Sequence, residues 1–270
     1  MSLLYVIFIA GELIMNKDNK IYICGMRINK PIPKSSYLAY LPVIKNLTDK
    51  GKLTFDSPIT FLVGENGIGK STLVEAIAVA YGFNPEGGTK NYNFRTKSSH
   101  SELCDYITLV KTTNFAKCGY FLRAESFYNT ISYIDYLSQE QKTDNDYYDN
   151  MKKNEHGIRS LHKMSHGESF LETIDSFPAN GLYILDEPEA ALSPSGIMKL
   201  ISRIDLLVKQ GCQFIISTHS PMLITMPNAD IYQLSKGAIE KVNYEETDHF
   251  IITRKFLNSP SQMLEYLLKE

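Results

Sequence analysis

The sequence predicts an α/β fold with a largely parallel β-sheet. Apolar, β-branched runs typical of buried strands alternate along the chain with segments of helical periodicity. A glycine-rich loop joins one such strand to a helix, and a later strand ends in two adjacent carboxylates. With 270 residues, of which 43% are hydrophobic, the chain is long enough to bury the core of one large domain or of two lobes.

The expected elements follow this alternation in chain order. Runs rich in β-branched and aromatic residues predict strands at 21–28, 52–55, 59–63, 106–110, 119–124, 182–187 and 213–218, with two short strands near 230–242. Apolar spacing of the helical kind predicts helices at about 70–81, 126–137, 195–210, 246–257 and 260–269. The polar composition of residues 139–163 predicts a surface segment.

The N-terminus and the cysteines indicate a cytoplasmic protein without a membrane span. Residues 2–10 are too short to cross a bilayer and lack the positive charge that begins a signal peptide, so a weak export signal is only the alternative interpretation. Met15 offers a second start, and we expect residues 1–14 to be a spurious or disordered extension before a single domain at 15–270. Wide spacing predicts reduced core thiols, not a zinc site or disulfides, for Cys24, Cys104, Cys118 and Cys212.

Overall charge does not identify a binding partner. The formal net charge of −2 gives no global attraction to nucleic acid or to an anionic membrane. One stretch, KNYNFRTKSSH at residues 90–100, interleaves basic and aromatic side chains. Such a mixture suits contact with phosphates and bases, but it is more often typical of a solvated loop.

The strongest chemical signal is GENGIGKST at residues 64–72, here called the phosphate loop. It fits the pattern G-x-x-x-x-G-K-[ST] between the strand 59–63 and the helix at about 70–81. The glycines let backbone N–H groups turn towards the β- and γ-phosphates, Lys70 supplies a positive charge, and the hydroxyl of Ser71 can hold Mg²⁺. The predicted nucleotide-binding residues are Gly64, Glu65, Asn66, Gly67, Ile68, Gly69, Lys70, Ser71 and Thr72.

Polar groups also follow two later strands. Asp186 and Glu187, here called the acidic pair, end the run LYIL, and His219 ends the run FIIST. Because the carboxyl ends of parallel strands meet at one edge of a sheet, we expect these groups to converge on the phosphate loop. Asp186 fits a residue that positions Mg²⁺, Glu187 fits a base that polarises the attacking water, and His219 can hydrogen-bond the γ-phosphate.

The segment MSHGES at residues 164–169, here called the signature segment, has the chemistry of a helix start. Ser165 can cap the first backbone N–H groups, and Glu168 follows at the spacing of a capping box. In order along the chain, GENGIGKS, MSHGES, LYILDEPEAALSP and STHSP resemble the ATP-binding-cassette class of ATPases, within it the soluble RecF-like and SMC-like branch. A capped helix start is itself an anion site, so both interpretations of the segment hold.

The resemblance implies a P-loop NTPase fold, with a mixed sheet flanked by helices and a small helical lobe at approximately 125–180 that carries the signature segment. It implies that Ser165 and Gly167 contact the γ-phosphate of ATP bound to a second copy, so that Mg-ATP holds a homodimer together. The adenine-stacking residue would be Tyr37 or Tyr40, and either could instead be a core residue. The implied activity is ATP hydrolysis by a stand-alone ATPase that signals to an unknown effector or partner protein, in a setting such as DNA repair or phage defence.

The chain departs from the family pattern at several positions. His166 and Glu168 stand where a transporter-type LSGGQ has Gly and Gln, Ser193 replaces an Asp after the acidic pair, and Glu125 stands where a Gln is expected. Two alternatives therefore accompany the resemblance. One is the nucleotide-binding subunit of a membrane transporter, and the other is a P-loop nucleotide kinase, whose lid would have to use Arg159 and Arg203.

Overall fold

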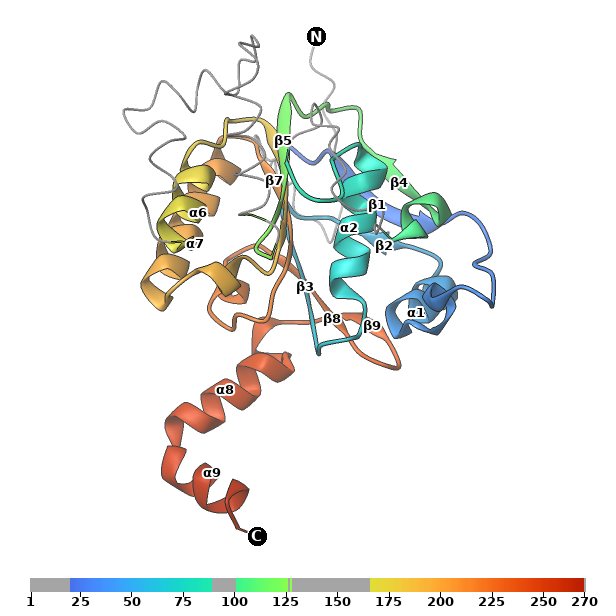
Figure 1. The fold of residues 1–270 in the computed structure, drawn as a ribbon. Coiled ribbons are helices and arrows are strands. Elements are labelled where there is room, and N and C mark those ends of the chain that lie inside the picture. Colours follow the sequence, from blue (N-terminus) through green and yellow to red (C-terminus); the bar gives the residue numbers. More distant parts are fainter. Residues whose placement is uncertain (1–19, 89–100, 126, 128–165, 270) are drawn as a thin grey trace, which may run out of the picture.

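The structure, a computed structural model, describes residues 20–88, 101–125, 127 and 166–269 (Figure 1). Several predictions therefore lie outside the described residues: the extension 1–14, the stretch 90–100, the surface segment 139–163, Ser165, Arg159, most of the helix 126–137 and most of the lobe 125–180. The described residues confirm the α/β class.

A six-stranded sheet forms the centre of the described chain, in the order β5-β6-β7-β3-β8-β9 (Figure 1). All neighbours in it are parallel except β8 and β9, so the sheet is mixed. Both faces are covered, and β3 and β6 are accordingly buried at every position. The strands are β3 (Ile59–Gly64), β5 (Cys118–Arg123), β6 (Gly181–Asp186), β7 (Gln213–Ser217), β8 (Asp230–Leu234) and β9 (Ile239–Lys241).

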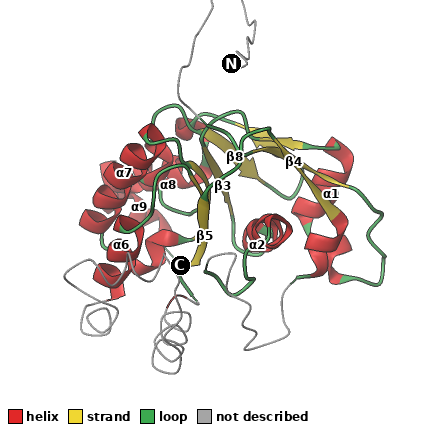
Figure 2. Ribbon diagram, turned by 90° about the horizontal axis from the view of Figure 1, so that it is seen from above, coloured by secondary structure: helices red, strands yellow, loops and turns green. Residues whose placement is uncertain are grey.

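A second, antiparallel sheet was not expected from the sequence. It has the order β2-β1-β4, with β1 at Ile23–Ile28, β2 at Leu53–Thr54 and β4 at Ile107–Lys111. Together with α1 (Pro42–Lys50) it packs against one side of α2 (Lys70–Tyr81), whose other side packs on the central sheet. Helix α2 therefore lies between the two sheets, and Figure 2 shows this helix end-on.

The opposite face of the central sheet carries a separate core with α6 (His166–Asp175) and α7 (Pro194–Lys209). Alternation along β6 separates the two cores, because Ile184 belongs to the core of α2 whereas Tyr183 and Leu185 belong to the core of α6 and α7. The phosphate-loop helix and the signature helix α6 thus lie on opposite faces of one sheet (Figures 1 and 2). Of the four cysteines predicted to lie in the core, only Cys212 is buried.

The C-terminal helices α8 (Asp248–Asn258) and α9 (Pro260–Leu267), here called the C-terminal arm, project from the body (Figure 1). Neither helix contains a buried residue. Among the described residues, no helix combines the length and the apolar character needed to cross a membrane.

Candidate functional site

The carboxyl ends of three parallel strands bring the candidate site together. Strand β7 pairs with β3 on one side and with β6 on the other, so that Ser217 lies beside both Leu62 and Asp186. The phosphate loop follows β3, the acidic pair ends β6, and His219 follows β7. The structure thus places these predicted residues along one edge of the sheet.

The conformation of the phosphate loop depends on its glycines. Gly67 and Gly69 have positive φ values of 77° and 105°, which side chains disfavour. At Gly64 a Cβ atom would lie 2.3 Å from the carbonyl oxygen of Leu234, and at Gly69 it would lie 2.5 Å from Cγ1 of Val43. Glycine at both positions therefore lets the loop pass close to β8 and α1.

Lys70 is buried at the start of α2 and points back into the loop. Its Nζ donates hydrogen bonds to the carbonyl oxygens of Gly64 at 2.8 Å and Glu65 at 3.0 Å. Burial lowers the pKa of Lys70, and the nearby carboxylates of Glu187 and Asp186 oppose that shift. Ser71 and Thr72 are half-buried in the next positions, while residues 65–67 are exposed. The loop thus combines an accessible rim with a cation at its base.

Asp186 is a buried carboxylate, 6% exposed, with two partners. Its Oδ1 accepts a hydrogen bond from the hydroxyl of Ser217, and its Oδ2 lies 3.5 Å from Nε of Arg123. A hydroxyl such as that of Ser71 and a carboxylate such as that of Asp186 are the hard oxygen donors that suit Mg²⁺. In the described chain no three His, Cys, Asp or Glu side chains are grouped as a metal site. A Mg²⁺ ion here would need further ligands from phosphate and water.

Glu187 adopts a left-handed backbone conformation (φ 50°, ψ 53°), uncommon for a residue with a side chain. Its N–H donates to the carbonyl oxygen of Ser217 at 3.1 Å, which fixes this turn at the end of β6. Burial and the neighbouring Asp186 raise the pKa of Glu187, with Lys70 acting in the opposite sense. A carboxylate with a raised pKa is a better proton acceptor, as a base for water requires.

His219 faces Glu187 and is neutral at pH 7. Burial, Lys70 and His249 lower its pKa to about 4. Its Nε2 lies 3.3 Å from Oε1 of Glu187 but makes no hydrogen bond to any described residue. Its backbone N–H donates to Glu189, on the 3₁₀ turn η3 (Pro188–Ala191). The backbone of His219 is thus held in place, while Nε2 of its imidazole is buried without a hydrogen bond to any described residue.

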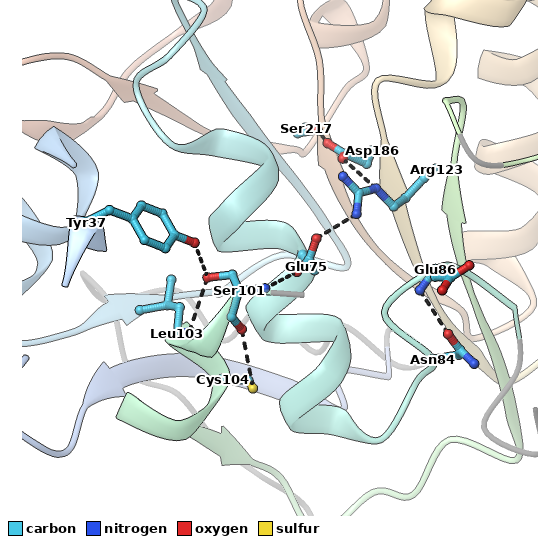
Figure 3. Close-up of polar contacts among 10 residues, drawn as sticks. All are labelled: Tyr37, Glu75, Asn84, Glu86, Ser101, Leu103, Cys104, Arg123, Asp186 and Ser217. Carbon is cyan, nitrogen blue, oxygen red and sulfur yellow. Dashed lines mark hydrogen bonds and ion pairs between the residues drawn. The ribbon is translucent and has the colours of Figure 1, made fainter. Parts of the chain in front are cut away.

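The sequence analysis missed three residues that contact this edge directly or through a neighbour: His249, Arg123 and Glu75. His249, at the start of α8, places its ring 4.9 Å from that of His219 and its Nε2 3.3 Å from the carbonyl oxygen of Gly64. Arg123, at the end of β5, lies between Glu75 of α2 and Asp186 (Figure 3). None of them belongs to a motif, and only the apolar surroundings of Glu75 in LVEAIAVA could have marked it as a buried charge.

The signature segment is described from His166 onward. Gly167 lies in the first turn of α6, where a Cβ atom would be 2.8 Å from the carbonyl oxygen of Ala191 in η3. This glycine therefore lets α6 pack closely behind the acidic pair, on the face opposite α2. Ser193, where an Asp was expected, caps α7 by accepting the N–H of Gly196.

The remaining candidates are placed as follows. Tyr37 and Tyr40 are 56% and 70% exposed, so the interpretation of either as a core residue is wrong. Glu125 is exposed beyond β5, near enough to Glu187 to contribute to its raised pKa. Arg203 of α7 pairs with Asp175 on the face away from α2, so it gives no support to a kinase lid.

Comparison with protein families identifies an AAA domain at residues 43–175, from α1 to the end of α6. A search of curated proteins finds an uncharacterized ABC transporter ATP-binding protein of Haemophilus influenzae, 26% identical over 175 residues. That match covers 62% of this chain and 65% of the relative, so it spans slightly less than two thirds of the relative's length.

Solved structures with similar folds include ATP-binding cassettes and an SMC head. A nucleotide-free cassette from an ABC transporter has 18% identity and a TM-score of 0.48, and a cassette in its ADP conformation has 17% and 0.47; each match covers 93% of this chain and 100% of the other. The SMC head domain of Thermotoga maritima has 14% identity and a TM-score of 0.41, covering 83% of this chain and 99% of the other.

Proposed function

We propose that this chain is a P-loop nucleotide-binding domain of the ATP-binding-cassette class, and that it is a soluble ATPase that binds and hydrolyses Mg-ATP; the AAA-domain match at residues 43–175 and the curated relative support this proposal. The observation that carries the proposal is the convergence of Lys70, the acidic pair and His219 along the carboxyl edge of β3, β6 and β7. The same edge combines donors for phosphate, oxygen ligands for a divalent cation and a carboxylate placed to accept a proton.

Each residue would have a distinct task in this reaction. Backbone N–H groups of the phosphate loop and Lys70 would bind the phosphates, and Ser71 and Asp186 would hold Mg²⁺. When bound, Mg²⁺ would neutralise part of the phosphate charge. Glu187 would accept the proton of the attacking water, and its raised pKa supports that task. His219, neutral and with its Nε2 making no hydrogen bond to any described residue, would hydrogen-bond the γ-phosphate.

We further propose that two copies form a homodimer around ATP. Within one copy the signature helix α6 and the phosphate-loop helix α2 lie on opposite faces of the central sheet, which favours completion of the site by a second copy. Ser165 and Gly167 of that second copy would contact the γ-phosphate. The closed dimer would then signal to an unknown effector or partner protein, in a setting such as DNA repair or phage defence.

The test is the solution mass of Glu187→Gln with and without Mg-ATP. Loss of the base should trap ATP, because the phosphate contacts of Lys70 remain intact, and the expected result is an ATP-dependent doubling of mass. Adding Ser165→Arg should abolish the doubling without preventing ATP binding, whereas Lys70→Ala should abolish both. A variant that binds ATP but stays monomeric would contradict the dimer, and a protein that binds no nucleotide would contradict the proposal as a whole.

A second candidate function is the nucleotide-binding subunit of a membrane transporter, because the curated relative is described as an ABC transporter ATP-binding protein. His166 and Glu168 in the signature segment disfavour it. Reproducible co-purification with an integral membrane protein, together with stimulation of ATP turnover by that protein, would establish the transporter role instead.

A further inference from the structure

Glu75 is a buried carboxylate in the middle of the phosphate-loop helix. It is 7% exposed and lies among the apolar residues that pack α2 between the two sheets. Both of its oxygens are engaged, since Oε1 accepts the N–H of Ser101 at 2.8 Å and Oε2 pairs with Arg123 at 2.6 Å (Figure 3). A charge at this position is costly unless a partner compensates it, and Arg123 is that partner.

Arg123 connects this carboxylate to the acidic pair. It is the last residue of β5 and lies in register with Asp186 on β6. Its guanidinium is shared unequally, because Nη1 is 2.6 Å from Oε2 of Glu75 whereas Nε is 3.5 Å from Oδ2 of Asp186. Ser217 holds the other oxygen of Asp186, so the carboxylate has little freedom to turn away (Figure 3).

This arrangement puts a fixed positive charge beside the carboxylate that would hold Mg²⁺. Two cations near one carboxylate repel each other, and the repulsion is large where the side chains are buried. The short bond to Glu75 keeps the guanidinium from closing fully on Asp186. The effect of Arg123 on metal binding thus depends on Glu75, which belongs to α2, the helix that follows the phosphate loop.

We propose that Arg123 is a positioning residue that limits the access of Mg²⁺ to Asp186, and that Glu75 holds Arg123 aside. This inference rests on the proposed binding of Mg-ATP. It assigns Arg123 and Glu75 opposite effects on the binding of Mg²⁺ at Asp186. A purely structural ion pair would not do so, since losing either partner would disturb the fold in the same direction.

The test is a Mg²⁺ titration of the binding of a fluorescent, non-hydrolysable ATP analogue to the full chain. Arg123→Gln removes the competing cation and should lower the Mg²⁺ concentration for half-saturation about fivefold. Glu75→Gln frees Arg123 to pair more closely with Asp186 and should raise that concentration about fivefold. The double variant should behave like Arg123→Gln alone, because Glu75 acts only through Arg123.

Asp205→Asn is the matched control, since it removes an exposed carboxylate that pairs with Lys209 at 2.6 Å on α7, and it should leave the titration unchanged. A parallel measurement on the wild-type chain follows the Nε–H resonance of Arg123, which should shift when Mg²⁺ is added with the analogue. This measurement needs no substitution and holds even if a variant fails to fold.

Three results would overturn this inference alone, provided that the wild type shows Mg²⁺-dependent binding of the analogue. They are shifts of the half-saturating Mg²⁺ concentration in the same direction for both variants, no shift in either variant, or an Arg123 resonance that does not move when Mg²⁺ is added. Wild-type protein whose analogue binding ignores Mg²⁺ would overturn the inference and the proposed Mg²⁺ site together.

Discussion

The phosphate loop and the C-terminal arm are both attached near the carboxyl edge of the central sheet, yet they are held in opposite ways. The helix that follows the loop is packed between two sheets and keeps seven of its residues buried, from Lys70 to Ala78. The arm has no buried residue, and its apolar side chains include Ile252, Leu257 and Tyr266, which are 61%, 71% and 79% exposed. Burial on this scale makes the loop geometry rigid, whereas the arm is held mainly at its first turn.

That first turn nevertheless contacts the site. Asp248 accepts a hydrogen bond from Gln233, and Phe250 packs edge-on against Tyr244. Between them His249 touches both the His219 ring and the carbonyl oxygen of Gly64. The rigid region and the loosely held region thus meet at His249. We therefore expect substitutions in the two regions to have effects whose sizes follow a predictable order.

The largest effect is expected from Gly64→Ala. The added methyl group would lie 2.3 Å from the backbone oxygen of Leu234, and the φ of 153° disfavours any side chain. We expect a loss of about 3 kcal/mol in the free energy of unfolding, measured by urea denaturation. Gly237→Ala is the control, because a Cβ there meets no atom within 4 Å. Equal stability of the two variants would show that the loop is less tightly packed than the structure indicates.

The next effect is the dependence of stability on pH that His219 causes. Its pKa is about 4 in the fold and about 6.5 when unfolded, so between these values only the unfolded chain gains the proton. His219 therefore contributes full stability above pH 6.5, and we expect a loss of about 3 kcal/mol as the pH falls to 4. The raised pKa of Glu187 acts in the opposite sense at low pH, so the comparison belongs in a Glu187→Gln background.

In that background, urea denaturation at several pH values should give a slope that His219→Asn removes. An unchanged slope would mean that His219 takes up its proton equally in both states, and its burial beside Lys70 would then be weaker than described.

The sequence was sufficient for features that local chemistry determines. The pattern from Gly64 to Thr72 specifies a loop between a strand and a helix, and apolar runs ending in Asp186 and His219 specify strand ends, so their common edge followed from parallel pairing alone. The roles of these residues stay predictions until nucleotide binding is measured.

Features that depend on contacts between distant segments could not be predicted. Glu75 and Arg123 are 48 residues apart in the sequence, and His249 is 185 residues from Gly64. Pairing of β1 with β4 and β2 likewise has no local signature, because a strand pattern does not name its partner. The sequence therefore predicted the motifs but not the residues that position them.

A smaller effect is expected from His249→Ala. It removes the contact with His219 and the approach to Gly64, and we expect a loss of about 1 kcal/mol in the free energy of unfolding. Because His249 helps to lower the pKa of His219, that pKa should rise in the variant, as NMR titration of the imidazole can measure. Lys255→Ala, an exposed change on the same helix, should alter neither quantity. If the pKa of His219 stayed at about 4 in this variant, the C-terminal arm would have no influence on the site.

The smallest effect is expected from Leu267→Ser in the arm. Leu267 is 61% exposed at the end of α9, so its substitution removes little buried surface and should change the free energy of unfolding by less than about 0.5 kcal/mol. The matched control is Leu200→Ala in α7, where a fully buried leucine should cost about 3 kcal/mol. Urea denaturation of both variants at several protein concentrations is the measurement. If Leu267→Ser were as costly as the control, and more so at high concentration, the arm would be packed against another copy, and the contrast between the two regions would hold only for a single chain.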